Sequence, residues 1–143
     1  MTFIEEVEEF VTECLRSKPL LESHFGTFSL DCVSGNSWKP DIVIVSTQLR
    51  VINGVKLIGE IKIQDYDGKH PTLNTYKEHM WRAYARLGDM KNWQVPKFLI
   101  FPYLEEKGRG FDFNIYFRSI DVTLLDWSKT EHVEMLKKQI DKL

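Results

Sequence analysis

The amino-acid sequence predicts a single α/β domain, in the broad sense that includes α+β folds, built around a mixed β-sheet and spanning residues 1–143. Two observations lead to this prediction. Helix-like and strand-like hydrophobic patterns follow one another in the order α-β-β-β-α-β-β-α. The chain also contains no repeat, low-complexity tract or linker that would divide its 143 residues into two units.

The first half of the chain contains one helix prediction and three strand predictions. Residues 3–16 have the spacing of an amphipathic helix, with Thr2 and Glu5 placed to form a capping box. Residues 27–33 are a weaker strand candidate. The β-branched run 41–45 and the alternating run 55–64 are strand predictions, and Asn53-Gly54 between them predicts a hairpin turn.

The second half contains two helices and up to three strands. Residues 72–87 have helical spacing, and Gly88 follows as a stop signal. Residues 97–101 are a buried-strand prediction, residues 111–117 alternate as a strand does, and a short strand is expected near 122–125. Ser128 and Glu131 are expected to cap a last helix that runs to the end of the chain.

The composition is that of an ordinary globular protein, with 43% hydrophobic and 28% charged residues. No apolar run approaches a membrane span, and the N-terminal residues are acidic rather than signal-like, so we expect a cytoplasmic protein without a membrane partner. Cys14 and Cys32 are too few for a disulfide framework, and neither lies in a C-x-x-C pair, so no thiolate zinc site is expected.

The formal net charge of −2 gives no overall basic footprint for nucleic-acid binding. The acidic residues are concentrated, however. Residues 1–31 carry seven acidic and two basic residues, a formal charge of −5, so the rest of the chain carries +3. The surfaces formed after residue 31 can therefore be locally positive.

Glu60 and Lys62 are the residues that most clearly suggest chemistry. On a strand their side chains point to the same face, and charged groups on a sheet built for burial are costly unless they are paired or bind a ligand. Asp41 begins the preceding strand, directly after Pro40. Two carboxylates brought together by adjacent strands can hold a hard divalent cation, and a lysine beside them can orient water or contact a phosphate.

This arrangement requires a particular chain path. If Asn53-Gly54 closed a regular two-residue hairpin, Thr47 would face Glu60, and Asp41 would lie roughly 20 Å away at the rise of a strand. At that distance, Asp41 and Glu60 could not bind the same metal ion. A bulge, bend or loop between Ser46 and Val51 is therefore expected to shorten the offset.

Pro40-Asp41 followed by Glu60-Ile61-Lys62, between one helix and the next, resembles the active-site signature of the PD-(D/E)XK nuclease superfamily, which includes restriction endonucleases and Holliday-junction resolvases. The resemblance covers residues 3–101. It implies a restriction-endonuclease-like αβββαβ core, here with an extra strand and a C-terminal helix. It also implies a nuclease that cleaves DNA as an endonuclease, through water activated by Mg²⁺ or Mn²⁺. Asp41, Glu60 and the Ile61 carbonyl would bind the metal, and Lys62 would be catalytic.

The resemblance suggests further residues. Gln64 shares the strand face of Glu60 and Lys62 and is a candidate to contact the catalytic residues rather than the metal. Relatives often add a glutamate from the first helix, for which Glu6 and Glu8 are the best-placed candidates. Small relatives commonly dimerise, so a homodimer is expected by analogy. Relatives with a Gln-x-x-x-Tyr pattern on the second helix differ from this chain, which has Thr72 before Tyr76.

A stripe on the predicted helix 72–87 is the candidate nucleic-acid contact. His79, Arg82 and Arg86 share it, and a helix that follows the catalytic strand can place such a stripe beside the active site, where it would contact phosphates.

Two alternatives stay open at this point. The same fold could serve as a nucleic-acid-binding or assembly subunit with weak or no activity, for which the low net charge argues. The chain could instead be an unrelated domain in which Glu60 and Lys62 form a surface ion pair. If the side chains of Asp41, Glu60 and Lys62 converge and are buried, the surface ion pair is excluded.

Overall fold

The fold is centred on a five-stranded mixed sheet with the strand order β1-β4-β5-β6-β7. The computed structural model describes residues 1–32, 35–63, 94–103 and 122–143. The β1-β4 and β4-β5 pairs are antiparallel, whereas β5-β6 and β6-β7 are parallel, which confirms the predicted mixed sheet. The strands are β1 (Leu21–His24), β4 (Ile42–Gln48), β5 (Val51–Ile61), β6 (Lys97–Phe101) and β7 (Val122–Asp126).

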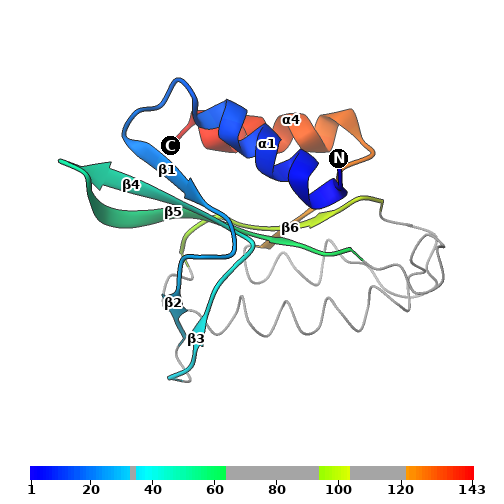
Figure 1. Cartoon of the computed structure of the whole chain (residues 1–143). Coiled ribbons are helices and arrows are strands. Elements are labelled where there is room, and N and C mark those ends of the chain that lie inside the picture. Colours follow the sequence, from blue (N-terminus) through cyan, green and yellow to red (C-terminus); the bar gives the residue numbers. More distant parts are fainter. Residues whose placement is uncertain (33–34, 64–93, 104–121) are drawn as a thin grey trace.

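Two helices, α1 (Phe3–Leu15) and α4 (Thr130–Asp141), lie side by side over one face of the sheet (Figure 1). The predicted cap of the first helix is confirmed, because the Thr2 hydroxyl accepts a hydrogen bond from the Glu5 N–H at 3.1 Å. The predicted cap of the last helix is wrong. Its N-cap is Lys129, with no side-chain cap, and the Ser128 hydroxyl instead donates to Oδ1 of Asp126, which turns the chain out of β7.

Each face of the sheet has its own apolar layer. On the helix side, strand residues such as Ile42 and Ile44 pack with the buried stripe of α1, which consists of Val7, Val11 and Leu15. On the other side, Val43, Val45 and Ile58 pack with Leu99 and Leu30. Because alternate residues of a strand point to opposite faces, Asp41, Glu60 and Lys62 belong to the side away from α1 and α4.

Two small elements differ from the sequence prediction. The strand expected over 27–33 consists only of β2 (Leu30–Asp31), which pairs with β3 (Ser37–Trp38) in a separate two-stranded sheet. The sequence does not predict the edge strand β1 (Leu21–His24), because its four residues contain one apolar side chain and show no hydrophobic alternation. It pairs with β4 over its whole length.

The predicted hairpin turn at Asn53-Gly54 is wrong. Gln48 pairs with Val51, so the two turn residues are Leu49 and Arg50, with φ of 52° and 65°. Positive φ at both positions is typical of a type I′ turn, which normally selects Asn or Gly. Leu49 is also 92% exposed, so neither backbone preference nor burial explains this residue pair.

The β4–β5 ladder contains two register irregularities, between Ile44 and Val45 and between Ser46 and Thr47. In each, β5 carries one extra residue: Asn53 lies between the partners of Thr47 and Ser46, and Lys56 between the partners of Val45 and Ile44. These are β-bulges. The expected shortening of the offset between Asp41 and Glu60 along the ladder is therefore present. It comes from the position of the turn and from two bulges rather than from a single irregularity.

The bulges also decide the face of Val55. Strict alternation along 55–64 would place Val55 on the face of Leu57, but Val55 packs with the layer that contains Ile58, whereas Leu57 packs on the helix side. A bulge at Lys56 produces this change, because one additional residue reverses the alternation of faces.

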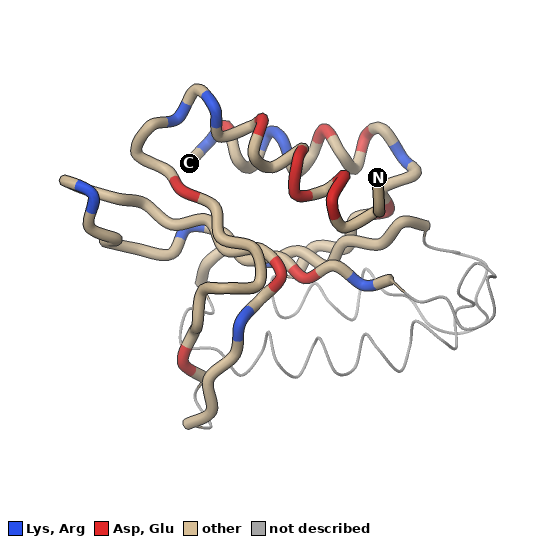
Figure 2. The backbone as a smooth tube through the Cα atoms, viewed as in Figure 1, with Lys and Arg blue, Asp and Glu red and all other residues tan. Residues whose placement is uncertain are grey.

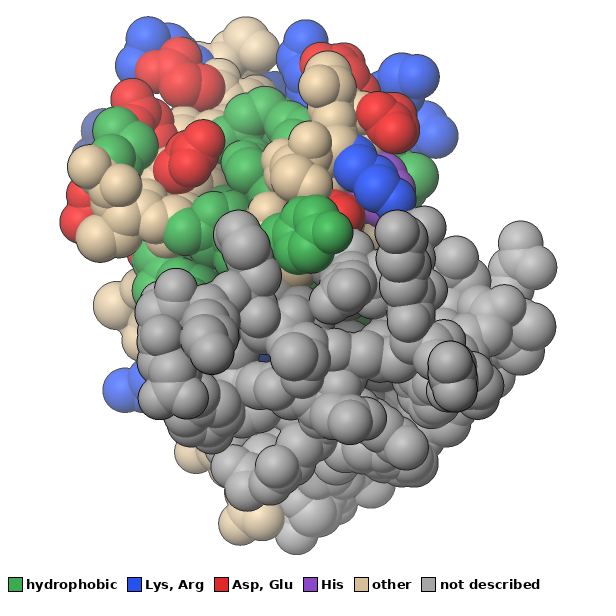
Figure 3. Space-filling model, turned by 90° about the vertical axis from the view of Figure 1, so that its right-hand side faces the viewer, with side chains coloured by type: hydrophobic (Ala, Val, Ile, Leu, Met, Phe, Trp, Pro, Cys, Tyr) green, Lys and Arg blue, Asp and Glu red, His purple; other side chains and the backbone are tan. Residues whose placement is uncertain are grey.

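The predicted helix 72–87 and strand 111–117 lie outside the described residues. In the described part of the chain, neither helix has the length and apolar character needed to cross a membrane. Acidic residues lie along α1, as expected from the charge distribution of the sequence (Figure 2). On the side of the molecule seen in Figure 3, hydrophobic side chains gather between acidic and basic ones. Ile4 of α1 and Met135 of α4 are exposed apolar side chains.

Candidate functional site

The two predicted carboxylates meet where β4 begins and β5 ends. The Asp41 N–H donates a hydrogen bond to Oε1 of Glu60 at 3.1 Å, and Oδ2 of Asp41 accepts one from the Ile61 N–H at 2.8 Å. The register explains the contact. Ile42 pairs with Gly59, so the preceding residue of β4 lies opposite the following residue of β5.

Lys62 completes the predicted trio. Its Nζ lies 3.1 Å from Oε2 of Glu60, and the two side chains are only 18% and 5% exposed. The Lys62 N–H donates to the Ile100 carbonyl, so the strand stays attached to β6 at this point. The three side chains therefore converge, with Glu60 buried and Asp41 and Lys62 half-buried, which argues against the alternative of a surface ion pair.

The electrostatics of the pair are unbalanced. Burial, and secondarily the negative charge of Asp41, raise the pKa of Glu60 from 4.5 to about 7, although Lys62 and the hydrogen bond from Asp41 act in the opposite direction. Burial of Glu60 beside a second carboxylate thus disfavours its ionised form, despite the nearby ammonium group. A bound cation would favour the ionised form.

Local sequence features hold the two strand ends together. The added Cβ of any larger residue at Gly59 would lie 3.2 Å from Cδ1 of Ile42, so glycine permits the close approach of β4 and β5 beside the carboxylates. Pro40 is buried and has no N–H to donate, and its carbonyl accepts a hydrogen bond from Gly26, which follows β1. Asp41 is thereby fixed between β1 and β5.

The structure describes only some of the other predicted site residues. Ile61 is part of the site through its N–H. Gln64 and the stripe of His79, Arg82 and Arg86 lie outside the described residues. Of the candidate glutamates of α1, Glu6 is exposed and Glu8 half-buried. Within residues 1–32, 35–63, 94–103 and 122–143, no three His, Cys, Asp or Glu side chains gather closely enough to hold a metal ion by themselves, so neither glutamate joins the carboxylate pair there.

Sequence reasoning missed His24. No metal-ligand spacing marks it, and β1 itself was not predicted. The structure pairs His24 with Val43 of β4, two residues from Asp41. The only sequence signal was the polar alternation of Glu22 and His24 in a short segment after Pro19.

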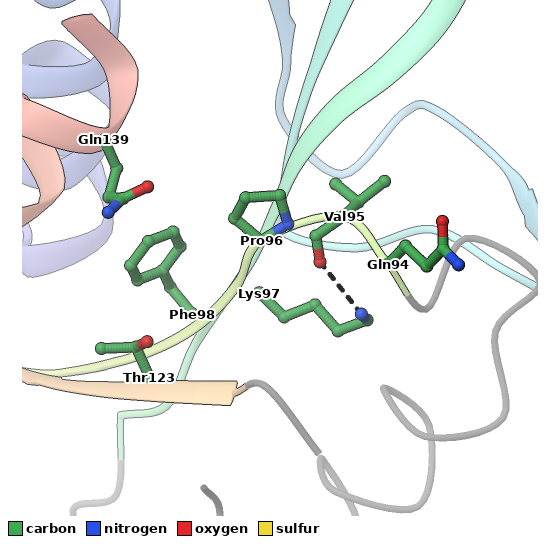
Figure 4. A pocket seen from close by; sticks show the side chains of 7 residues that line it. All are labelled: Gln94, Val95, Pro96, Lys97, Phe98, Thr123 and Gln139. Carbon is green, nitrogen blue, oxygen red and sulfur yellow. Dashed lines mark hydrogen bonds between the residues drawn. The ribbon is translucent and has the colours of Figure 1, made fainter. Parts of the chain in front are cut away.

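A separate pocket lies at the opposite end of β6, where the strand begins (Figure 4). Lys97 is buried there, and its ammonium group donates to the Val95 carbonyl at 2.9 Å. None of the lining residues carries a carboxylate, so this pocket is distinct from the carboxylate pair. The lining residues are Gln94, Val95, Pro96, Lys97, Phe98, Thr123 and Gln139.

Comparisons with protein-family models, with curated proteins and with solved structures found no match for this chain.

Proposed function

We propose that the chain is a divalent-metal-dependent nuclease that hydrolyses phosphodiester bonds of DNA, with Asp41, Glu60 and Lys62 as its active site. The observation that carries the proposal is the contact of the half-buried Asp41 with the buried Glu60, beside Lys62, where burial disfavours the ionised form of Glu60. Carboxylates forced together at a strand end are expensive for the fold unless they serve a ligand.

The residues present suit Mg²⁺ or Mn²⁺. Such ions are commonly held by one or two carboxylates, with water and substrate phosphate completing the shell, so two carboxylates suffice. A strand residue directs its N–H and C=O to the same side. Because the Ile61 N–H reaches Asp41, the Ile61 carbonyl is directed to that side too and is a suitable third ligand.

When bound, the metal would lower the pKa of a coordinated water and polarise the phosphate. The chain's own residues have separate tasks. Asp41 and Glu60 would hold the cation, and the backbone N–H groups that donate to the two carboxylates fix their spacing. Lys62 would orient the attacking water and offset the negative charge that develops on the phosphate.

The sheet order also supports the proposal. The sequence resemblance implies a helix, three strands, a helix and a strand. The chain has α1 before an antiparallel β1-β4-β5 unit, and β6 is parallel to β5. A parallel neighbour requires a crossover connection, and residues 64–93 supply the length for one.

The test is a cleavage assay on supercoiled plasmid, linear duplex, single strand and four-way junction, with Mg²⁺ or Mn²⁺. The near-isosteric variants Asp41→Asn, Glu60→Gln and Lys62→Met are expected to lose cleavage. The exposed residues Asp31 and Lys56 provide matched controls, Asp31→Asn and Lys56→Met, which should retain it. Cleavage that survives in all three site variants would refute the proposal.

Absence of cleavage by the wild-type protein, together with binding of the same DNA, would favour the second candidate: a nucleic-acid-binding or assembly subunit on this fold. The net charge of −2 is the observation that keeps this candidate open. The predicted stripe of His79, Arg82 and Arg86 is expected to contact DNA under either candidate function. Replacing both arginines with alanine is expected to weaken DNA binding and reduce its dependence on salt.

A further inference from the structure

The two chain segments that carry the carboxylate pair separate directly beyond it. The regular β4–β5 ladder ends one residue short of Asp41 and Glu60. Beyond the pair, the Pro40 carbonyl accepts a hydrogen bond from the segment that follows β1, whereas the Lys62 N–H donates to a carbonyl of β6. Because β1 and β6 lie on opposite sides of the β4–β5 hairpin, the carboxylates lie in a fork with one arm held towards each of these strands (Figure 1).

Each arm of the fork carries a lysine two residues from a carboxylate. Lys62 follows Glu60 on the β5 arm, and Lys39 precedes Asp41 on the β4 arm, so that basic segments border the two acidic ones (Figure 2). Two residues of extended chain span at most about 7 Å between Cα atoms. Neighbouring phosphates of a nucleic-acid strand are separated by a similar distance. Lys39 is therefore close enough to contact the phosphate next to one that is bound at the carboxylate pair.

The backbone at Lys39 is anchored on both sides. Trp38 precedes it in β3, where it pairs with Leu30 of β2, and the half-buried indole packs against the apolar layer away from α1 and α4. Pro40 follows it and is buried. Lys39 itself is exposed. The Cα atom of Lys39 is thus held in place relative to Asp41, while its side chain reaches solvent and can meet a ligand there.

The charges around Lys39 suit an anion. None of the ion pairs between side chains in the described part of the chain uses Lys39, whereas the Lys62 ammonium already contacts Glu60. Asp41 is the one acidic residue between positions 32 and 59, a segment that also contains Lys39, Arg50 and Lys56. The chain that leads into the fork is therefore basic, in contrast to residues 1–31, and is complementary to a phosphodiester backbone.

We propose that Lys39 binds the phosphate that neighbours the scissile one on the cleaved strand. This inference rests on the proposed nuclease function. The charge of the neighbouring phosphate does not change during the reaction, so Lys39 holds the substrate equally well in the ground state and in the transition state. Lys62 acts instead at the phosphate on which charge develops. The two lysines of the fork thus have separate tasks, binding for Lys39 and chemistry for Lys62.

The first experiment compares Lys39→Met with Lys39→Arg and with the exposed control Lys56→Met. Lys39→Met is expected to raise KM for DNA about tenfold, the effect of one lost hydrogen bond between charged groups, and to leave kcat within about twofold of the wild type. The slope of log Kd against log salt concentration, measured without metal, should become shallower by about 0.9, the share of one phosphate. Lys39→Arg keeps the charge and should stay within about threefold of the wild type. Lys56→Met should match it.

The second experiment locates the phosphate that Lys39 contacts. The phosphates on either side of the mapped cleavage position are replaced, one at a time, by an uncharged methylphosphonate. For the wild type, this replacement at one of the two phosphates next to the scissile one should weaken binding about tenfold. For Lys39→Met, the same replacement should cost less than about twofold, because the contact is already lost. Lys56→Met should show the full wild-type loss.

The outcomes separate this proposal from the proposed function. Equal methylphosphonate losses in the wild type and Lys39→Met at both neighbouring phosphates would overturn the role of Lys39, while metal-dependent cleavage by the wild type still stood. A fall in kcat with an unchanged KM would overturn it as well. No cleavage by the wild type would overturn both proposals, since no phosphate would then be scissile. Thermal unfolding of Lys39→Met should match that of the wild type, because the side chain is exposed.

Discussion

The Asp41 N–H donates a hydrogen bond to Oε1 of Glu60 across the β4–β5 ladder, although 19 positions separate the two residues in the chain. In return, Oδ2 of Asp41 accepts from the residue after Glu60. The two carboxylates are thus positioned mainly by backbone groups. Their geometry depends on the register of one hairpin, and the consequences of this arrangement can be measured.

The first prediction concerns the pH dependence of stability. Glu60 has a pKa of about 7 in the folded protein against 4.5 as its reference, so the folded state binds its proton more tightly than the unfolded state does. Stability from this group is therefore fully present below pH 4.5 and is lost as the pH rises to 7, by up to about 3 kcal/mol.

Urea denaturation of the wild type and Glu60→Gln at pH 5 and pH 8 tests this prediction. The difference between the two pH values should be smaller in the variant, which cannot ionise at this position. If the free energy of unfolding changes with pH in the same way in both proteins, the pKa of Glu60 is not raised in the folded state.

The second prediction concerns metal binding in the absence of nucleic acid. Because a cation would relieve the repulsion between Asp41 and Glu60, Mn²⁺ at pH 8 should raise the Tm of the wild type. At a free concentration 100 times the Kd, the stabilisation is about 2.7 kcal/mol. Glu60→Gln should lose this response, whereas the surface variant Asp31→Asn should keep it. An equal shift in all three proteins would place the ion elsewhere.

The third prediction separates the charge of Lys62 from its catalytic task. Lys62 lowers the pKa of Glu60, so Lys62→Met should raise that pKa above its wild-type value. It should also reduce cleavage by about 100-fold or more. Lys62→Arg keeps the charge and should keep the pKa of Glu60 close to that of the wild type, yet restore little activity, because a planar guanidinium differs from a compact ammonium. Full activity in Lys62→Arg would reduce the role of Lys62 to charge alone.

The fourth prediction concerns the close approach at Gly59. An added methyl would meet Ile42 at 3.2–3.3 Å, so Gly59→Ala should destabilise the fold by about 1–3 kcal/mol and separate Asp41 from Glu60. Ile42→Val removes the Cδ1 atom nearest to the new methyl. The double variant should therefore be less destabilised than the sum of the single variants, as thermal unfolding of all four proteins will measure. Simple additivity would contradict the predicted contact.

The fifth prediction concerns the hairpin turn. Leu49 and Arg50 adopt left-handed backbone conformations that Asn and Gly tolerate far better. Replacing them together by Asn and Gly should stabilise the protein by about 2 kcal/mol and leave cleavage unchanged, since the turn lies at the far end of β4 from Asp41. Loss of activity without loss of stability would instead assign the exposed Leu49 side chain a functional contact.

Much of the fold follows from local pattern. The helices Phe3–Leu15 and Thr130–Asp141 and the strand Lys97–Phe101 lie close to their predicted bounds, because their apolar spacing is long or dense. β1 was missed because four residues carry too little periodicity. The turn was misplaced because Asn53-Gly54 is the better local turn sequence, but the ladder uses those residues at a bulge. Pairing along the whole hairpin outweighed local turn preference.

The sequence by itself determined which residues could form a site: a carboxylate after Pro40, and Glu60 and Lys62 on one face of a strand. Only the tertiary structure decided that they meet. From the turn at Leu49 and Arg50, a regular ladder would set Asp41 opposite Ile58, and the two bulges move it two places, opposite Glu60. An even shift keeps both side chains on one face, whereas a single bulge would have turned them apart.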